Sequence, residues 1–379
     1  MAINVVLYSP GLGYINRGFE SLTREIYQAL AQEDIVNLTL FQGTGEVLPG
    51  AIPIWAPKRN AKFYDSNLIK NFKYRQYFSY TLENLFFSLP VVAHCYQHPC
   101  DVVYFSDNIP ADCLHFIRKY FGGSFKLLFC NGAPASPTDY MRYDYVQVMT
   151  PAQYQEAIEA GYPQHKLFLI PQGLNCHSFS LNLKSEEIKK QKKQWNLPVD
   201  KYIVLSVGAI NLGHKRMNWL IEEFSRLDPN TFFLWMVGQH EKETPYVKAL
   251  AASKLKSNTY KFDVISYSEI SLAYAVANCF VLCSLNEGFG RVYIEAMASE
   301  LPVIAHRNVN TEWILGDKNL GLIDMTKSGE LENKIIYFYQ QKNTALNQGY
   351  NNQTTAFQKF DWASLHSQYI DMLRDISRI

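Results

Sequence analysis

Short apolar runs alternate along the chain with longer segments in which apolar and polar positions follow a helical period. In the first half, residues 3–8 and 101–105 are apolar almost throughout, and an amphipathic stretch covers residues 21–32. The same alternation restarts after about residue 200. Strands that are apolar throughout and alternate with helices are typical of parallel sheets covered on both faces. The pattern therefore predicts an α/β chain with two doubly wound, Rossmann-like domains.

The apolar runs place the strands one by one. In the first half they are predicted at residues 3–8, 37–41, 101–105, 126–130, 145–149 and 166–170. In the second half they are predicted at residues 202–208, 231–238, 279–284 and 302–305, with helices over 218–224, 269–277 and 292–299. Between about residues 50 and 95 the pattern is less regular.

The boundary between the two domains is predicted at Pro171 and Gly173, which interrupt the chain directly after a strand. The first domain then comprises residues 1–171 and the second comprises residues 172–359. The C-terminal segment is amphipathic, with Asp361 as a candidate N-cap. By its pattern alone this last segment could pack on either domain.

Composition and charge narrow the class of protein. Of the 379 residues, 47% are hydrophobic and 19% are charged, so the chain can fill two cores and is not intrinsically disordered. Lysine and arginine exceed aspartate and glutamate by 36 − 35 = 1, which gives no overall field for DNA or RNA. The seven cysteines form no disulfide framework, and the N-terminal residues lack the pattern of a signal peptide. We therefore expect a cytoplasmic protein.

The strongest candidate site is the sequence EGFG (287–290), which separates a predicted strand from a predicted helix. Gly288 and Gly290 permit a close approach of the backbone to a ligand, and the free N–H groups of the new helix favour a phosphate. Glu295, about one turn into the helix, can accept two hydrogen bonds from a vicinal diol such as a ribose, and Glu287 can hold another hydroxylated ring. For the glycines and Glu287 alone, the alternative is an ordinary strand–turn–helix junction with an acid that complements the helix dipole.

A second loop, SVGAINLGHKR (206–216), also runs from a strand through a glycine turn, at Gly208, to a helix. Lys215 and Arg216 stand at the start of that helix, where cations oppose the helix dipole. A bound diphosphate would account for them, held by the point charge of Lys215 and the donor geometry of Arg216. The alternative is that both are solvated basic residues.

Together the two loops resemble glycosyltransferase family 4, whose enzymes have the GT-B fold and transfer sugars from nucleotide donors with retention. The segments that carry the resemblance are EGFGRVYIEAMA (287–298) with its E-x7-E spacing, VGAI (207–210), HKR (214–216), LIEEF (220–224), IPQGLN (170–175) and the terminal DW…QYIDMLRDI (361–376). The resemblance implies two Rossmann-like domains that face across a cleft. It assigns residues 1–171, with the C-terminal helix 360–379, to the acceptor side, and residues 172–359 to the nucleotide sugar.

The resemblance also implies a role for each matching position in the two domains. Glu295 matches the acid that holds the donor ribose, Glu287 the acid that touches the donor sugar, and Lys215 the lysine that neutralises the diphosphate. The backbone of Phe289 and Gly290 would face the sugar and the diphosphate. Two further pairs match in the same way: Val264 and Ile265 lie where the family's backbone meets the nucleobase, and Gly11 and Gly13 match the loop that approaches donor and acceptor.

The chain departs from the family pattern at two places. The family usually has an arginine directly after the VG turn, where this chain has Ala209 and Ile210, so we expect Arg216 or Arg291 to compensate. Many members offer a histidine to the donor sugar where this chain has Asn131. An amide can hydrogen-bond a sugar hydroxyl, but it cannot share a proton as histidine can.

The implied mechanism needs no protein nucleophile, no metal and no cofactor besides the nucleotide sugar. Lys215, an arginine and the helix termini stabilise the departing diphosphate, while the acceptor hydroxyl attacks from the same face. Glu287, Lys215 and Asn131 are the expected catalytic residues. Two alternatives remain open, a GT-B sugar-nucleotide epimerase and a catalytically silent GT-B binding protein or partner subunit.

The segment 58–78 combines positive charge with aromatic residues. Between residues 58 and 75 six lysines or arginines and one acid give a net charge of 6 − 1 = +5. Three interpretations are open: a solvated basic helix whose aromatic residues lie in the core, a contact with an anionic membrane surface, and a binding site for an anionic acceptor.

Overall fold

The computed structural model describes residues 2–15, 18–31, 33–59, 61, 75–132 and 135–378. The chain divides into two compact units, Met1–Gly173 with Leu365–Ile379, called unit 1, and Leu174–Ser364, called unit 2. The sequence places its boundaries at 171/172 and 359/360.

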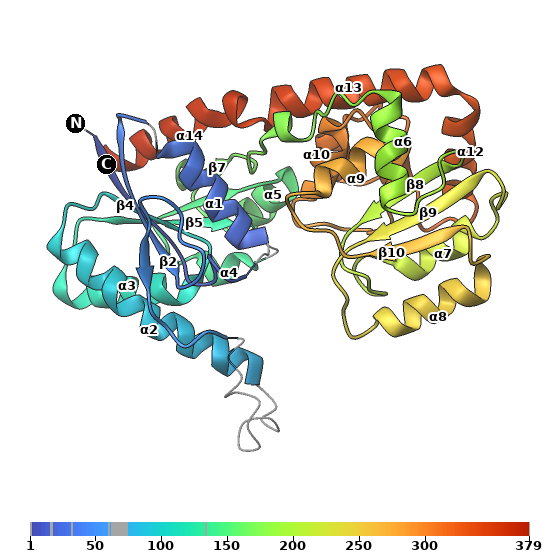
Figure 1. Ribbon diagram of the computed structural model, residues 1–379. Coiled ribbons are helices and arrows are strands. Elements are labelled where there is room, and N and C mark those ends of the chain that lie inside the picture. The colour runs from blue at the N-terminus through green and yellow to red at the C-terminus, as the bar shows by residue number, and fades with distance from the viewer. Residues whose placement is uncertain are drawn as a thin grey trace. The chain divides into compact units, whose positions relative to one another are not determined.

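Unit 1 is built on a parallel sheet of seven strands (Figure 1). The strands are β1 (Ile3–Ser9), β2 (Val36–Gly43), β3 (Ile52–Ile54), β4 (Val102–Phe105), β5 (Lys126–Asn131), β6 (Tyr145–Val148) and β7 (Leu167–Leu169). Their order in the sheet is β3-β2-β1-β4-β5-β6-β7. Val5 of β1 lies opposite Leu38 of β2 on one side and Val102 of β4 on the other. The chain therefore reverses its direction of strand addition between β1 and β4, which is the topological switch point of this sheet.

Helices cover both faces of the first sheet. They are α1 (Gly18–Leu30), α2 (Arg75–Gln97), α3 (Asn108–Phe121), α4 (Pro137–Tyr140), α5 (Pro151–Glu159), the 3-10 turn η2 (Gln164–Lys166) and most of α14 (Trp362–Ser377). Figure 1 shows α1 and α14 on one face, and α2 and α3 on the other. The core beneath α2 and α3 is aromatic, because Tyr8 stacks on Phe105 with ring centroids 5.8 Å apart and Phe87 of α2 contacts Tyr8.

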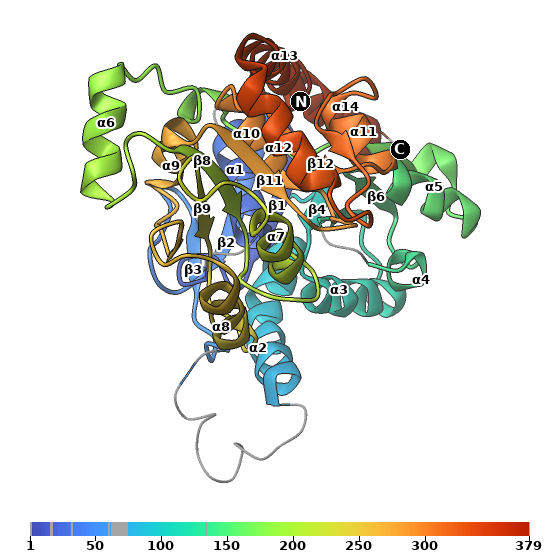
Figure 2. The ribbon, with the colours of Figure 1, turned by 90° about the vertical axis from the view of Figure 1, so that its right-hand side faces the viewer.

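Unit 2 repeats the same plan with a parallel sheet of order β10-β9-β8-β11-β12-β13. The strands are β8 (Tyr202–Val207), β9 (Phe232–Val237), β10 (Tyr260–Asp263), β11 (Cys279–Leu282), β12 (Val303–His306) and β13 (Leu322–Ile323). The helices are η3 (Cys176–Ser178), α6 (Ser185–Gln194), α7 (Met217–Phe224), α8 (Thr244–Lys254), α9 (Ile270–Val276), α10 (Arg291–Ala298), α11 (Val309–Leu315), α12 (Glu330–Gln340) and α13 (Lys342–Phe360). The views in Figures 1 and 2 place α7 and α8 on one face of the sheet, and α9 and α10 on the other. The switch point of this sheet lies between β8 and β11.

The predicted fold class is confirmed, since both units carry a doubly wound parallel sheet. The ends of the predicted strands differ from those in the structure by at most two residues. Asp361 caps α14 as expected, because its Oδ1 accepts a hydrogen bond from the Ala363 N–H over 2.9 Å. The prediction is incomplete between residues 50 and 95, where β3 and the long helix α2 lie.

The basic and aromatic segment 58–78 falls mostly outside the described residues, which include only 58, 59, 61 and 75–78 of it. Its three interpretations therefore stay predictions. Within the described ranges, no helix has the length and hydropathy that crossing a bilayer requires.

Gly349, inside α13, gives a test of the packing in unit 2. Alanine ordinarily stabilises a helix by about 1 kcal/mol relative to glycine. At Gly349 alanine should instead destabilise the protein, because a Cβ there would lie 2.0 Å from the backbone carbonyl oxygen of Glu300. We expect Gly349→Ala to lower the free energy of unfolding by about 2 kcal/mol in urea denaturation. The matched control is Asn351→Ala at an exposed position of the same helix, and equal stabilities of the two variants would contradict this packing.

Candidate functional site

The switch point of unit 2 brings together the two loops that the sequence singles out. Val204 of β8 lies opposite Cys279 of β11, so the two neighbouring strands end at the same edge of the sheet. The loop after β8 covers residues 208–216 and leads into α7, and the loop after β11 covers residues 283–290 and leads into α10. Ligands of open parallel sheets bind at this edge, beside the point where the strand order reverses.

Lys215 and Glu287 form an ion pair across these two loops. The Lys215 Nζ lies 2.6 Å from the Glu287 Oε1, and the two side chains are only 12% and 10% exposed. His214, which is about half exposed, places its Nε2 3.5 Å from the same oxygen. Removing either partner of such a buried pair would leave an uncompensated charge, so Lys215 needs an anion at this place.

The backbone around Lys215 fixes the position of its side chain. The Lys215 N–H donates to the Oδ1 of Asn211 over 2.8 Å, and the amide nitrogen of Asn211 donates to Glu241 over 3.0 Å. Gly208 lies against the lysine stem, since a Cβ at this position would be 3.1 Å from the Lys215 Cε. The glycine turn therefore allows the lysine to lie flat along the loop and to reach Glu287.

The EGFG sequence turns tightly into α10. Gly290 is the N-cap of this helix in the left-handed region, with φ of 81°, and a Cβ there would lie 2.6 Å from the Tyr293 ring. Gly288 has no positive φ, so it does not use the conformational freedom that the sequence allows it. The side chain of Phe289 is buried against Phe360, with ring centroids 6.0 Å apart. Of Phe289, the backbone rather than the side chain is left to face a ligand.

Glu295 lies in a buried hydrogen-bond network. Its Oε2 accepts from the Tyr274 hydroxyl over 2.8 Å, and its Oε1 accepts from the Arg291 Nε over 2.9 Å. Burial and the nearby Glu295 carboxylate raise the pKa of Tyr274 well above its ordinary value, which keeps its hydroxyl a donor. The Arg291 guanidinium also hydrogen-bonds the hydroxyl of Tyr267 and lies over its ring. Each carboxylate oxygen of Glu295 thus already holds one protein donor.

The remaining predicted positions of unit 2 are Arg216, which pairs with backbone carbonyls, and Val264 and Ile265, which follow a strand. Arg216 has a left-handed backbone, with φ of 50°, and its Nη1 donates to the carbonyls of Cys283 and Met325 at 3.2 and 3.0 Å. It therefore ties α7 to the end of β11 and to the segment after β13. Val264 and Ile265 follow directly after β10, and Val264 is exposed.

In unit 1, the predicted residues lie at the ends of β1 and β5. Asn131 is the last residue of β5 and is buried, and its side-chain nitrogen has no hydrogen-bond partner among the described residues. Gly11 lies against a carboxylate, since a Cβ there would be 2.2 Å from the Glu20 Oε1. Gly13 has φ of 102°, and a Cβ there would be 2.9 Å from the Glu46 carbonyl oxygen.

The sequence analysis missed a buried polar cluster at the switch point of unit 1. Glu83 of α2 pairs with Arg59 over 2.6 Å and accepts a hydrogen bond from Tyr14. Asp107, the N-cap of α3 in the loop after β4, accepts from the Tyr80 hydroxyl over 2.9 Å, and burial raises the pKa of its carboxyl. Two signals in the sequence could have found it: Glu83 is the only acid of its helix, and Asp107 follows a strand at the ligand-binding edge.

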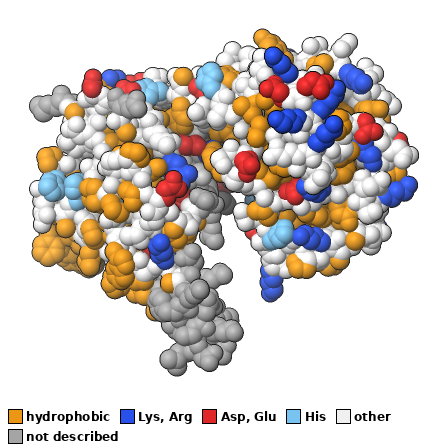
Figure 3. Space-filling model, in the orientation of Figure 1, with side chains coloured by type: hydrophobic (Ala, Val, Ile, Leu, Met, Phe, Trp, Pro, Cys, Tyr) orange, Lys and Arg blue, Asp and Glu red, His pale blue; other side chains and the backbone are white. Residues whose placement is uncertain are grey.

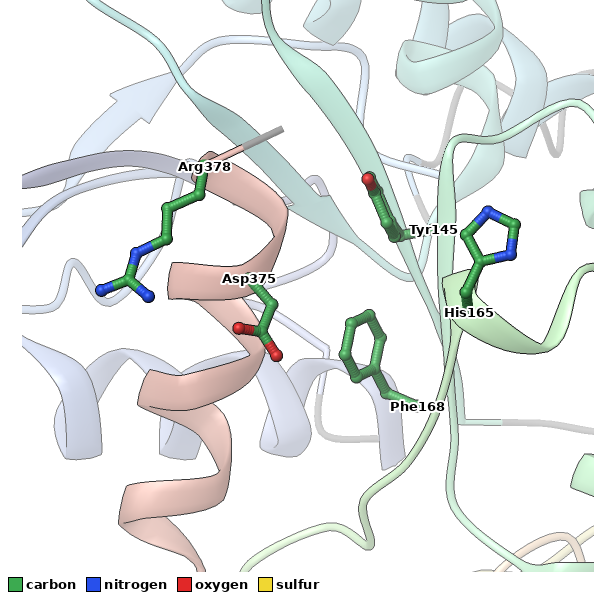
Figure 4. Close-up of a pocket in the computed structure, with 5 residues that line it drawn as sticks. All are labelled: Tyr145, His165, Phe168, Asp375 and Arg378. Carbon is green, nitrogen blue, oxygen red and sulfur yellow. The ribbon is translucent and has the colours of Figure 1, made fainter.

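Unit 1 also has a pocket of about 310 Å³, which is lined by Tyr145, His165, Phe168, Asp375 and Arg378. Figure 4 shows Asp375 on α14 and Arg378 directly after this helix to one side, and the rings of Tyr145 and Phe168 between the helix and His165. Tyr145 begins β6 and His165 precedes β7, so the pocket lies toward the amino ends of these strands. It is therefore separate from the edge where the predicted residues lie.

The unit 2 site offers a defined set of chemical groups. Lys215 supplies a cation, the first turn of α10 supplies free backbone N–H groups, and Glu287 supplies an acceptor for hydroxyl groups. This set suits a ligand that carries both phosphate and hydroxyl groups. Among the described residues, no group of three or more His, Cys, Asp or Glu side chains is placed to hold a metal ion.

Comparison with known sequences gives one family model and several curated relatives. A family model described as "Glycosyl transferases group 1" matches residues 187–355. The chain is 25% identical over 176 residues to an alpha-monoglucosyldiacylglycerol synthase of Acholeplasma laidlawii, which covers 45% of this chain and 44% of that protein. The chain spans about half the length of the curated relatives it matches.

Comparison with solved structures covers nearly the whole chain. A sucrose-phosphate synthase of Thermosynechococcus elongatus aligns over 99% of both chains with a TM-score of 0.77 and 19% identity. The HepE protein of Anabaena, in complex with UDP-glucose, aligns over 98% of this chain and 99% of that chain with a TM-score of 0.75 and 16% identity. At these identities the likeness shows the fold.

Two buried tyrosines give a matched test of the Glu295 network. Tyr274 and Tyr293 are both fully buried, but only Tyr274 donates to Glu295, whereas the Tyr293 hydroxyl has no hydrogen-bond partner among the described residues. We expect Tyr274→Phe to lower the free energy of unfolding by about 1–2 kcal/mol, because a buried carboxylate loses a donor. Tyr293→Phe removes an unpaired hydroxyl and should leave stability unchanged or slightly higher. Thermal and urea unfolding measure both, and the reverse order would contradict the network.

Proposed function

We propose that the protein is a retaining glycosyltransferase, since a family model of group 1 glycosyl transferases matches residues 187–355. It moves a sugar from a nucleotide-diphosphate donor to an acceptor hydroxyl and needs no metal. The observation that carries this proposal is the Lys215–Glu287 pair at the switch point of the second sheet. A cation and an acid beside a helix N-terminus match the phosphate and the hydroxyls of such a donor.

In this proposal the bound donor replaces a contact between two protein side chains. The diphosphate takes the place of Glu287 beside Lys215 and accepts hydrogen bonds from the first turn of α10. Glu287 is then released to accept a hydrogen bond from the sugar. Glu295, whose two oxygens each keep a second lone pair, holds the ribose, and the backbone at Val264 and Ile265 meets the base.

The chemistry then follows from charge stabilisation. The bond between the sugar and the diphosphate breaks while Lys215 and the α10 N-terminus stabilise the negative charge that develops on the leaving group. The acceptor hydroxyl attacks from the same face, and its proton passes to the departing phosphate. No side chain forms a covalent bond with the sugar.

We assign the acceptor to unit 1. The amide nitrogen of Asn131, which has no hydrogen-bond partner among the described residues, is a donor that a ligand hydroxyl can satisfy, and a buried donor without a partner is costly to the protein. Gly11 and Gly13 let the loop after β1 pack closely against Glu20 and the Glu46 carbonyl, where a Cβ would not fit, and this holds the loop at the ligand-binding edge of the sheet.

A membrane lipid is the acceptor class that we favour. The relative from Acholeplasma laidlawii is named as a synthase of alpha-monoglucosyldiacylglycerol, a lipid product. In this chain, the basic and aromatic segment 58–78 has the composition of a contact with an anionic lipid surface. We therefore propose that the protein works at the periphery of a membrane.

The Lys215–Glu287 pair gives the test of the donor site. We expect Lys215→Ala to weaken the binding of a nucleoside diphosphate about 10–100-fold, because a charge-assisted contact of about 1.5–3 kcal/mol is lost, and to leave nucleoside binding unchanged. Glu287→Gln should bind the diphosphate more tightly, since it frees Lys215, but should lose turnover with the nucleotide sugar. Calorimetry with UDP, GDP, ADP, their nucleosides and their sugars measures these effects.

The matched control is Lys254→Ala, an exposed lysine of α8 in the same unit, which should change none of these affinities. Equal diphosphate affinities of Lys215→Ala and Lys254→Ala would refute the assignment of the donor site.

The proposed absence of a metal requirement is tested by dialysis against EDTA. Since Lys215 and helix N–H groups neutralise the diphosphate, we expect the rate of sugar transfer to stay within about twofold of the untreated rate. A rate that is lost after dialysis and restored by Mg²⁺ or Mn²⁺ would overturn this part of the mechanism.

A further inference from the structure

The face of α2 that points away from the first sheet is apolar between residues 77 and 96. Its exposed side chains between residues 77 and 97 include no charged group, and the only acid of the helix, Glu83, is buried. At about 100° per residue, four of the exposed positions fall within about 20° of one line along the helix: Phe78, Leu85, Leu89 and Tyr96. A helix that is hydrophobic all round is normally buried, so this face needs a partner.

Neighbouring elements extend this surface. Trp55 is 70% exposed and meets Phe86 of α2 edge-on, with ring centroids 6.2 Å apart. The last turns of α3 expose further aromatic side chains, up to 80% for Phe121. They are joined to α2 by the Tyr96 hydroxyl, which donates to the Gly122 carbonyl over 2.6 Å. We call the exposed apolar side chains of α2 and of the last turns of α3, with Trp55, the apolar face.

The apolar face differs from the rest of the described surface. Figure 3 shows hydrophobic side chains gathered over the part of unit 1 formed by α2 and α3. Outside these two helices, no described helix exposes more than two large apolar side chains. Scattered apolar residues are ordinary on a protein surface, but a contiguous patch marks an interaction site.

We propose that the apolar face docks on the surface of an anionic phospholipid bilayer. Tyrosine and tryptophan side chains combine an apolar body with a polar end, which suits the boundary between acyl chains and water. The sequence that leads into α2, residues 58–75, carries a net charge of 6 − 1 = +5, which complements anionic headgroups. This charge complementarity favours a bilayer over a second copy of this nearly neutral chain.

The inference deepens the proposed function, because it names the surface that brings the enzyme to a lipid acceptor. The role of the surface rests on the proposed function. Its test does not, since vesicle binding is measured without any sugar donor.

The test uses paired variants with matched exposure. Leu89→Gln with Phe121→Gln removes two apolar side chains that are 72% and 80% exposed from the apolar face. The control, Leu346→Gln with Tyr350→Gln, removes two that are 70% and 64% exposed from α13. Co-sedimentation is measured with vesicles of phosphatidylcholine alone and of phosphatidylcholine with phosphatidylglycerol. Equal unfolding temperatures of the three proteins ensure that folding is not the cause of a change.

We expect the unaltered protein and the control to bind the anionic vesicles, and the apolar-face variant to bind them at least tenfold more weakly. A second readout is the blue shift of tryptophan fluorescence on vesicle binding, which Trp55→Phe should reduce. The proposal is overturned if the unaltered protein does not bind anionic vesicles or if both double variants bind them equally well. It is also overturned if the apolar face instead forms a dimer that does not bind vesicles. Nucleotide binding by the same samples reports separately on the proposed function.

Discussion

A lysine and a glutamate that are both largely removed from water must keep a counter-charge, and this requirement organises the second unit. The Lys215–Glu287 pair joins the loops after two neighbouring strands, and Asn211 and Gly208 hold the lysine in place. The pair satisfies both charges within the protein. Under the proposed function, a ligand that brings its own anion and its own hydroxyls replaces each partner, so the contact that stabilises the loops also selects the ligand.

The two units share one sheet topology, but the polar groups at their switch points differ. In each sheet, the reversal of strand order leaves an opening at the ends of two adjacent strands, and polar groups gather there. In unit 2 these groups are a lysine, an acid and a helix N-terminus. In unit 1 they are Arg59, Glu83 and Asp107 with tyrosine hydroxyls, and they are paired among themselves. Under the proposed function the first arrangement exchanges a partner with an anion, whereas the second holds the loop that carries Gly11 and Gly13 through the hydrogen bond from Tyr14 to Glu83.

The sequence predicted the two sheets well because strands buried on both faces are apolar throughout and are separated by helices. It predicted α2 poorly for the opposite reason: the solvent side of this helix is as apolar as its buried side, so no helical period appears. β13 was missed because a two-residue strand leaves no periodic signal.

The sequence also predicted which side chains lie at the edge of the second sheet, but not their partners. It placed Glu295 one turn into a helix after a glycine loop, yet nothing in that motif indicates that Tyr274, from α9, donates to it. Likewise, the charge of Arg216 suggested a phosphate ligand, while its left-handed backbone turns the guanidinium toward the carbonyls of Cys283 and Met325. Contacts between distant segments depend on packing, which local pattern does not encode.

The path of the chain has a consequence for synthesis. Unit 2 is continuous, whereas unit 1 takes its last helix, α14, from the far side of unit 2 in the sequence. Six side chains of α14 are buried, and its Tyr369 accepts a hydrogen bond from Gln147 of β6 and donates to the Pro171 carbonyl. The first half of the nascent polypeptide therefore leaves the ribosome with the face of its sheet that carries α1 only partly covered. Unit 1 cannot complete its fold until the second half has been translated, and during this time it is accessible to chaperones and proteases.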